Sequence, residues 1–159
     1  MALNSIRYTV TEAVRYRGRS GHYSWLLHRL SGLAILGFLL IHVWDGSMAT
    51  YSPRNYAWTI ALFKNPLFGI GEIVVFGAVI YHALNGLRIT LLDWKPHWWK
   101  YQDSSAKLVW GLFLLLFIPL GGMLLFQTIG HCSHLVEYAN GQELSCFAIP
   151  PREAFGLGQ

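Results

Sequence analysis

His82 is the residue of this sequence best placed to bind a metal, because it lies deep in a long apolar stretch, PLFGIGEIVVFGAVIYHALNGLRITLL. A neutral imidazole offers one nitrogen as a metal ligand and needs a hydrogen-bond acceptor for its other N–H. The small residues Ala83 and Gly86 follow, and Gly86 lies one helical turn along the same face. This combination leaves room for a flat macrocycle. In a soluble protein, the same lone histidine would more often be a satisfied core residue.

A polar helix face around His28 is the second candidate site. Ser24, His28, Ser31 and Gly32 fall at i, i+4, i+7 and i+8, which is one face of a helix. Hydroxyl, imidazole and small groups there suit a ligand with carbonyl or carboxylate oxygens, such as a quinone head or haem propionates. Arg29 would attract propionates through charge-assisted hydrogen bonds. Taken alone, Arg29 is also compatible with a side chain that extends to the lipid headgroups.

His42 and Glu72 are two further ionisable residues in apolar stretches. On a continuous helix His42 lies about 21 Å beyond His28, which places it near the opposite membrane boundary. One interpretation of His42 is an interfacial histidine beside Trp44 and Asp45. Glu72 lies at a similar depth in the second stretch. It is a partner for His42, part of a proton route, or a carboxyl group held neutral.

Membrane-spanning helices must position these residues. The sequence is 53% hydrophobic and 13% charged, whereas about a quarter of the residues in soluble domains are charged. Residues 24–44, 66–92 and 107–128 form apolar runs of about 20 residues or more, enough to cross about 30 Å of hydrocarbon as helices. We therefore predict an all-α membrane protein with three transmembrane helices, the third kinked at Pro119.

The distribution of basic residues predicts the orientation of these helices. The positive-inside rule puts the N-terminus in the cytoplasm and the C-terminus outside. The predicted organisation is a cytoplasmic N-terminal segment (1–23), a membrane domain (24–128) and an extracytoplasmic tail (129–159). The formal charge of +4 does not indicate a nucleic-acid partner, because the basic residues gather at the ends of apolar runs. On the cytoplasmic side are Arg7, Arg15, Arg17, Arg19, Arg29, Arg88, Lys95, Lys100 and Lys107, and on the other side are Arg54, Lys64 and Arg152.

The two ends of the chain carry weaker signals. The first twenty residues hold no long apolar core, so we expect no cleavable signal peptide. The tail is polar with a Pro150–Pro151 pair, which predicts irregular structure. It holds both cysteines, Cys132 and Cys146, which form a disulfide or remain two independent thiols.

The segments SWLLHRLSG and YHALNGLRITLLD resemble the cytochrome b membrane anchor of succinate dehydrogenase, that is, of complex II. That family carries S-x-x-H-R-x-[ST]-G at the start of its first helix and H-x-x-x-G-x-R-x-x-x-x-D late in its second. The resemblance covers residues 24–94, includes the number of spans, and looks closest to forms from actinobacteria. The first motif here reads His28, Arg29, Ser31 and Gly32, and the second reads His82, Gly86, Arg88 and Asp93.

The resemblance implies roles for these residues. His82 matches the axial ligand of haem b, and the second axial ligand is expected from a partner anchor subunit. His28 and Arg29 match residues near the haem propionates, and Arg29 also matches the quinone site. Asp93 matches an acidic residue at the cytoplasmic end of the second helix, and Gly86, Arg88 and Asp93 are expected to support the site.

Trp25 and His42 are the two positions at which the resemblance leaves a role open. The family's quinone-contacting serine stands where this chain has Trp25, so Ser24, Ser31 or a partner residue would take that role. Two-haem members of the family carry a histidine ten residues after the Ser-Gly pair that ligates an outer haem, and His42 has that spacing. A ligand of a second haem and an unligated interfacial histidine are the two interpretations of His42.

The resemblance implies a multi-pass anchor of succinate:quinone oxidoreductase in the plasma membrane, an enzyme of electron transport and the tricarboxylic acid cycle. A flavoprotein subunit would oxidise succinate, and an iron–sulfur subunit would pass electrons to ubiquinone or menaquinone near the cytoplasmic face. This chain has no flavin site, so it is a subunit of an enzyme. The alternatives are a fumarate reductase anchor, an anchor of another respiratory dehydrogenase, and a transporter in which His42, Glu72 and His82 form a proton path.

Overall fold

Three long helices dominate the computed structural model, which describes residues 20–132, 136–137, 143–144 and 147–157. They are α2 (Ser20–Tyr51), α4 (Pro66–Trp94) and α5 (Gln102–Cys132), with 32, 29 and 31 residues. Each is long and apolar enough to cross a membrane. At about 1.5 Å per residue each helix exceeds the roughly 30 Å of hydrocarbon, so its ends reach into the headgroup layers.

Short elements connect and extend these helices. Helix α3 (Pro53–Phe63) joins α2 to α4, and the 3-10 helix η1 (Pro96–Tyr101) joins α4 to α5. Proline opens α3, α4 and η1, where its fixed φ suits the first helical position and its missing N–H costs nothing. The C-terminal part contains a two-residue antiparallel strand pair and a 3-10 helix, namely β1 (Val136–Glu137), β2 (Glu143–Leu144) and η2 (Arg152–Phe155).

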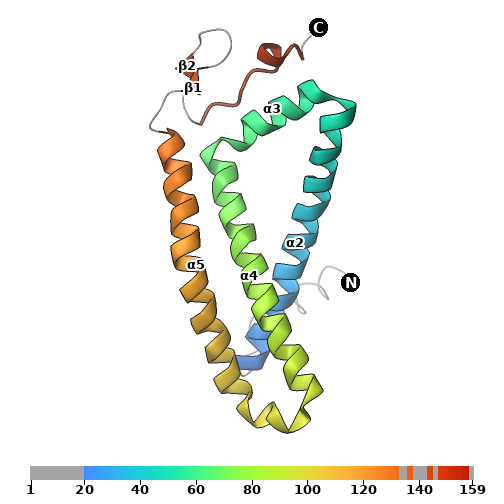
Figure 1. The fold of residues 1–159 in the computed structure, drawn as a ribbon, viewed down its shortest axis with the longest axis vertical. Helices are drawn as coiled ribbons and strands as arrows, with labels where there is room; N and C mark the ends of the chain where they lie inside the picture. Colours follow the sequence, from blue (N-terminus) through green and yellow to red (C-terminus); the bar gives the residue numbers. More distant parts are fainter. Residues whose placement is uncertain (1–19, 133–135, 138–142, 145–146, 158–159) are drawn as a thin grey trace, which may run out of the picture.

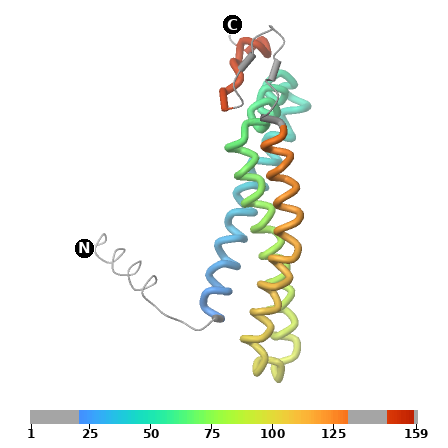
Figure 2. Tube along the Cα trace, turned by 90° about the vertical axis from the view of Figure 1, so that its left-hand side faces the viewer, coloured from blue at the N-terminus to red at the C-terminus, as the bar shows by residue number. Residues whose placement is uncertain are grey.

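The three long helices are not equally close to one another (Figure 1). Helices α4 and α5 lie side by side along most of their length, also when the molecule is turned by 90° (Figure 2). Helix α2 crosses close to α4 where α2 begins and diverges from it toward α3. We refer to these two ends of the bundle as the η1 end and the α3 end. The buried apolar core lies toward the η1 end, where it comprises Tyr81, Leu92, Ala106 and Val109.

Most side chains of the spans face away from the bundle. The divergent part of α2 is the clearest case, because Leu39, Leu40 and Ile41 are 51%, 65% and 60% exposed. Successive residues of a helix point about 100° apart, so these three side chains are exposed on different sides of α2 with few neighbours among the described residues. Exposed apolar side chains in a membrane span are suited to contact with lipid or with other membrane subunits.

The α3 end is covered by the C-terminal segment. Trp58 Nε1 in α3 donates a hydrogen bond to the carbonyl of Pro150 at 2.9 Å, and the Arg152 guanidinium lies over the same indole ring. The Asn65 side chain caps α4 by accepting from Leu67 N, and it also donates to the Phe147 carbonyl at 3.0 Å. These contacts link the middle of α3 and the start of α4 to the chain after α5.

Glycine permits the close approach of α4 and α5. A Cβ atom on Gly77 would lie 2.8 Å from the Phe117 ring, and that ring is itself stacked on Phe113. We expect Gly77→Leu to lower the free energy of unfolding by about 1–3 kcal/mol through overpacking. Thermal unfolding of the purified complex measures this loss. Gly37→Leu is the matched control because no atom lies within 4 Å of its added Cβ, and equal losses in both variants would contradict the prediction.

The predicted all-α fold and the three predicted spans are confirmed, and each span lies inside an observed helix that extends beyond it. Helix α5 continues through Pro119. The prediction of irregular structure after residue 129 was wrong in part, since α5 extends to Cys132 and the tail forms β1, β2 and η2. Apolar periodicity revealed only the long spans, so α3 was missed.

The side chains of Cys132 and Cys146 lie outside the described residues, and the disulfide stays a prediction.

Candidate functional site

The imidazole rings of His28 and His82 stack on each other where α2 crosses α4. Their centroids are 3.9 Å apart and the ring planes differ by 8°. The predicted polar face of α2 is the face that makes this crossing, since Ser24 and Ser31 are both buried against it. The structure therefore brings together the two histidines that the sequence assigned to separate motifs.

One nitrogen of His82 is occupied by a backbone acceptor. Nδ1 of His82 lies 3.0 Å from the carbonyl oxygen of His28 and 3.2 Å from Ser31 Oγ. The Ser31 hydroxyl donates to the same His28 carbonyl at 2.9 Å. A carbonyl oxygen carries no proton, so the contact with His82 is a hydrogen bond only when Nδ1 is the protonated nitrogen. In that tautomer Nε2 keeps its lone pair, which is the arrangement of a metal-binding histidine.

The two histidines and two glycines of the crossing are arranged reciprocally. A Cβ atom on Gly32 would lie 3.0 Å from Cε1 of His82, and a Cβ atom on Gly86 would lie 3.3 Å from Cε1 of His28. Each glycine follows the histidine of its own helix by one turn, and the helices run in opposite directions (Figure 1). Each imidazole therefore rests against the glycine of the other helix. A side chain at either glycine would crowd the opposite ring.

His28 has a polar atom without a partner. Its Nδ1 is buried, and it is the only buried side-chain nitrogen or oxygen that lacks a hydrogen bond in the part of the chain that the structure describes. An unpaired buried polar atom is costly. A ligand oxygen or a water at this position would satisfy it.

A polar network lies next to the histidines toward the η1 end. Asn85 is fully buried, and its Nδ2 donates to the Ser24 carbonyl at 3.2 Å. Arg88, also buried, donates to Asn85 Oδ1 at 3.2 Å, to Ser105 Oγ at 2.9 Å and to the Gln102 carbonyl at 3.0 Å. The predicted supporting residue Arg88 thus links α4 to α5, and Asn85 extends the link to α2.

Arg29 lies on a different side of α2 from His28. Its guanidinium lies 3.9 Å from the centroid of the Trp25 ring, one turn earlier, and both side chains are exposed. Guanidinium groups stack favourably on indole rings. Asp93 is also exposed, in the last turn of α4. The pair of Trp25 and Arg29 therefore presents a cation and an aromatic edge to molecules outside this chain.

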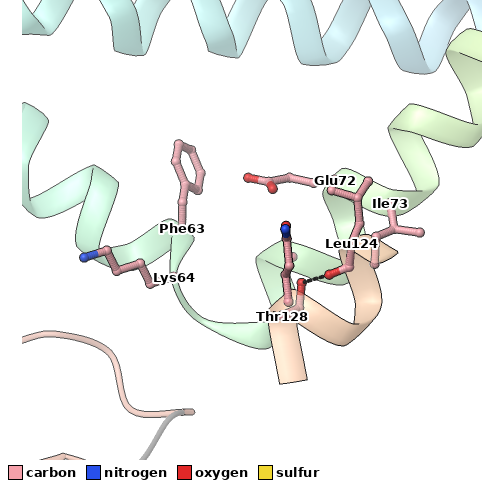
Figure 3. A pocket seen from close by; sticks show the side chains of 8 residues that line it. Phe63, Lys64, Glu72, Ile73, Leu124 and Thr128 are labelled. Carbon is pink, nitrogen blue, oxygen red and sulfur yellow. Dashed lines mark hydrogen bonds between the residues drawn. The ribbon is translucent and has the colours of Figure 1, made fainter. Parts of the chain in front are cut away.

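His42 and Glu72 are not in contact with the histidine pair. The exposed His42 ring stacks on Phe38 of its own helix, with ring centroids 5.6 Å apart. Glu72 lines a cavity of about 200 Å³ at the α3 end, between α3, α4 and α5 (Figure 3). The other lining residues are Phe63, Lys64, Gly69, Ile73, Leu124, Gln127 and Thr128, none of which comes from α2.

Two residues that contact the crossing were missed at the level of sequence. Tyr81 and Asn85 contact the Ser24 carbonyl, at 3.4 Å and 3.2 Å, and neither is a defining position of the two sequence motifs. A usable signal existed for Asn85, because a polar amide inside an apolar span needs a partner. Its role became visible only when the helix crossing placed Ser24 opposite it.

The fold and the site define a class, namely multi-pass membrane proteins with three spans and a histidine pair at a helix crossing. A sequence model of the family described as "Succinate dehydrogenase/Fumarate reductase transmembrane subunit" matches residues 4–121. The succinate dehydrogenase 2 membrane subunit SdhC of Mycobacterium tuberculosis is 38% identical over 124 residues, which cover 75% of this chain and 91% of that protein.

An archaeal relative is also similar. The succinate dehydrogenase hydrophobic membrane anchor subunit of Archaeoglobus fulgidus is 33% identical over 97 residues, which cover 61% of this chain and 83% of that protein. This chain belongs to the family of succinate dehydrogenase/fumarate reductase transmembrane subunits. It is a membrane anchor subunit of a succinate dehydrogenase, and the bacterial relative indicates the plasma membrane. The resemblance drawn from the sequence motifs is confirmed.

Proposed function

We propose that this anchor subunit binds haem b through His82 and contributes to a quinone site near the η1 end. The observation that carries the proposal is the contact between His82 Nδ1 and the His28 carbonyl at 3.0 Å. That hydrogen bond fixes the tautomer and ring orientation of the imidazole and directs the lone pair to Nε2. A histidine held in this way is prepared to ligate a metal.

The surrounding residues fit a haem. Gly32 and Gly86 contribute no side chain beside the rings, and the unpaired Nδ1 of His28 offers a polar contact for a propionate oxygen. His82 would supply one protein ligand of the haem from this chain, and the family resemblance implies that a partner anchor subunit would supply the other. When bound, haem b would take up and release single electrons, and its potential would depend on the ligands and on nearby hydrogen bonds.

Arg29 and Trp25 support a quinone site beside this pair. A guanidinium donates hydrogen bonds to carbonyl oxygens and favours the negative charge that develops when a quinone is reduced. Ser24 is buried at the crossing with α4, whereas Trp25 and Arg29 are exposed, so of these three residues the latter two are accessible to a quinone. Ser31 already donates to the His28 carbonyl and lies beside His82.

The complex implied by this function contains three further subunits. A flavoprotein and an iron–sulfur subunit would meet the anchor at the η1 end, and a second anchor subunit would pack beside α2 and α4. The excess of basic residues at the η1 end supports a cytoplasmic location for that end. Electrons from succinate would then reach quinone without crossing the membrane. A fumarate reductase would use the same anchor in the opposite direction.

A reduced-minus-oxidised spectrum of the purified complex tests the proposal. Pyridine-haemochrome quantitation should give at least one haem b per flavin. A complex with intact flavin and no haem would overturn the assignment of His82 and leave the anchor as a haem-free subunit.

Substitution of His42 distinguishes a complex with one haem per flavin from a complex with two. We expect a complex with two haems per flavin to retain one after His42→Ala, since a second axial site would lose its ligand. A wild-type complex with one haem per flavin should keep it unchanged after the same substitution, because the His42 ring lies outside the His28–His82 site. Haem quantitation against flavin distinguishes the two cases. Complete loss of haem in the variant would contradict both.

A further inference from the structure

Two side chains of α4 donate hydrogen bonds to two carbonyl oxygens of α2 that are one helical turn apart. His82 Nδ1 contacts the His28 carbonyl at 3.0 Å, and Asn85 Nδ2 contacts the Ser24 carbonyl at 3.2 Å. The order is that of antiparallel helices, because the later residue of α4 meets the earlier residue of α2. Two such bonds define the axial position of one helix against the other, which a single bond does not.

The orientation of the Asn85 amide is determined by its second partner. Arg88 donates to Oδ1 at 3.2 Å, and a guanidinium has donors only. The oxygen must therefore face Arg88, and the NH₂ group must face the Ser24 carbonyl. A rotated amide would place NH₂ against the guanidinium and two oxygens against each other. Asn85 needs one donor and one acceptor on a short side chain, which a leucine or an ionised aspartate does not provide.

Arg88 is in turn fixed from α5. Its Nε donates to Ser105 Oγ at 2.9 Å and one terminal nitrogen donates to the Gln102 carbonyl at 3.0 Å. The chain of bonds thus runs from the start of α5 through Arg88 and Asn85 to α2. Tyr81 adds a longer contact of 3.4 Å to the same Ser24 carbonyl.

We infer that Asn85 is a positioning residue for the histidine site. Its bond to Ser24 sets the register of α2 against α4, and this register brings the His28 carbonyl within reach of His82 Nδ1. Loss of the bond would let α2 shift and would weaken the contact that orients the His82 imidazole. The inference adds a positioning residue to the proposed function. Only the haem-based readout of the experiment below depends on that proposed function.

Two substitutions of Asn85 and one control test the inference in the assembled complex. Asn85→Asp keeps an acceptor for Arg88 but removes the donor to Ser24, and Asn85→Leu removes both. Ser105→Ala is the matched control, because it removes one Arg88 bond in the same network without touching α2. Tyr81→Phe removes the longer contact and should have a smaller effect than Asn85→Asp.

The primary readout is the ¹⁵N resonance of His82 Nδ1 in the histidine-labelled complex, reduced with dithionite so that a haem on this ring would be diamagnetic, and assigned by difference against His82→Gln. Both Asn85 variants should shift this resonance toward a weaker hydrogen bond, whereas Ser105→Ala should leave it in place. The low-spin haem signal in electron paramagnetic resonance, which depends on imidazole orientation, should change in the same two variants. If Asn85→Leu does not assemble, Asn85→Asp decides the outcome.

An unshifted His82 resonance in Asn85→Asp, or an equal shift in Ser105→Ala, would overturn the inference and reduce Asn85 to a general packing role. The failure of the proposed function is distinguishable from this result. A wild-type complex without haem would remove the paramagnetic signal but not the ¹⁵N resonance. The effect of Asn85 on the hydrogen bond of His82 Nδ1 would still be measured.

Discussion

Replacing His82 by glutamine is expected to give a complex without haem b at this site. Glutamine retains a polar side chain that can reach the His28 carbonyl, but it has no imidazole nitrogen to bind iron. A haem held through His82 would lose a protein ligand, and its affinity for the complex would fall. The reduced-minus-oxidised spectrum should therefore lack the haem b band, and pyridine-haemochrome quantitation should fall by one haem per flavin.

His97→Gln provides the matched control for this substitution. His97 is an exposed histidine of η1 whose ring contacts Trp98, and it lies outside the helices α2 and α4 that form the crossing. Its haem content should equal that of the wild type. Retention of all haem in His82→Gln would show that the free nitrogen of His82 serves another purpose. The reciprocal packing with Gly32 would then be purely structural.

The second large effect is expected at Arg29. Substitution by alanine should lower succinate:quinone reductase activity by about 10- to 100-fold, because hydrogen bonds from charged groups contribute about 1.5–3 kcal/mol. The exposed guanidinium above Trp25 is the cationic donor of α2 accessible to a quinone. Reduction of an artificial acceptor by the flavin and iron–sulfur subunits should stay unchanged.

Two further variants sharpen the Arg29 experiment. Arg29→Lys should retain part of the activity, since lysine keeps the charge but loses the planar group that stacks on the indole. Arg54→Ala, at an exposed position in α3, should leave the succinate:quinone reductase activity unchanged. Equal quinone reduction by wild type and Arg29→Ala would assign the cation to lipid headgroups, the alternative that the sequence left open.

The membrane spans and the polar face of α2 were predictable because both depend on local periodicity. Twenty apolar residues need a helix in hydrocarbon, and positions 24, 28, 31 and 32 share a face on any helix. His82 was identifiable for a related reason, since an imidazole in an apolar span is uncommon. These properties require no knowledge of how the helices pack.

The partner of each side chain was not predictable, because partners depend on the angle and register of the crossing. Nothing in the sequence indicated that His28 stacks on His82 or that each ring meets a glycine of the other helix. The pairing of Glu72 with His42, one of the alternatives for Glu72, is not seen in the structure. Glu72 instead faces a cavity lined by α3, α4 and α5 (Figure 3). Helix α3 was missed because its 11 residues are too short and too mixed to register as a span.

The divergence of α2 from α4 also determines how far each residue of α2 is displaced when the tilt of this helix changes. Helix α2 meets α4 at the η1 end, and among the described residues α3 joins the two helices at the far end (Figure 1). The crossing therefore acts as a pivot, and a change in the tilt of α2 displaces each residue in proportion to its distance from that pivot. His28 and His82 lie at the pivot, whereas His42 lies on the long arm. Changes in membrane thickness or in subunit packing would thus move the far end of α2 more than the histidine pair.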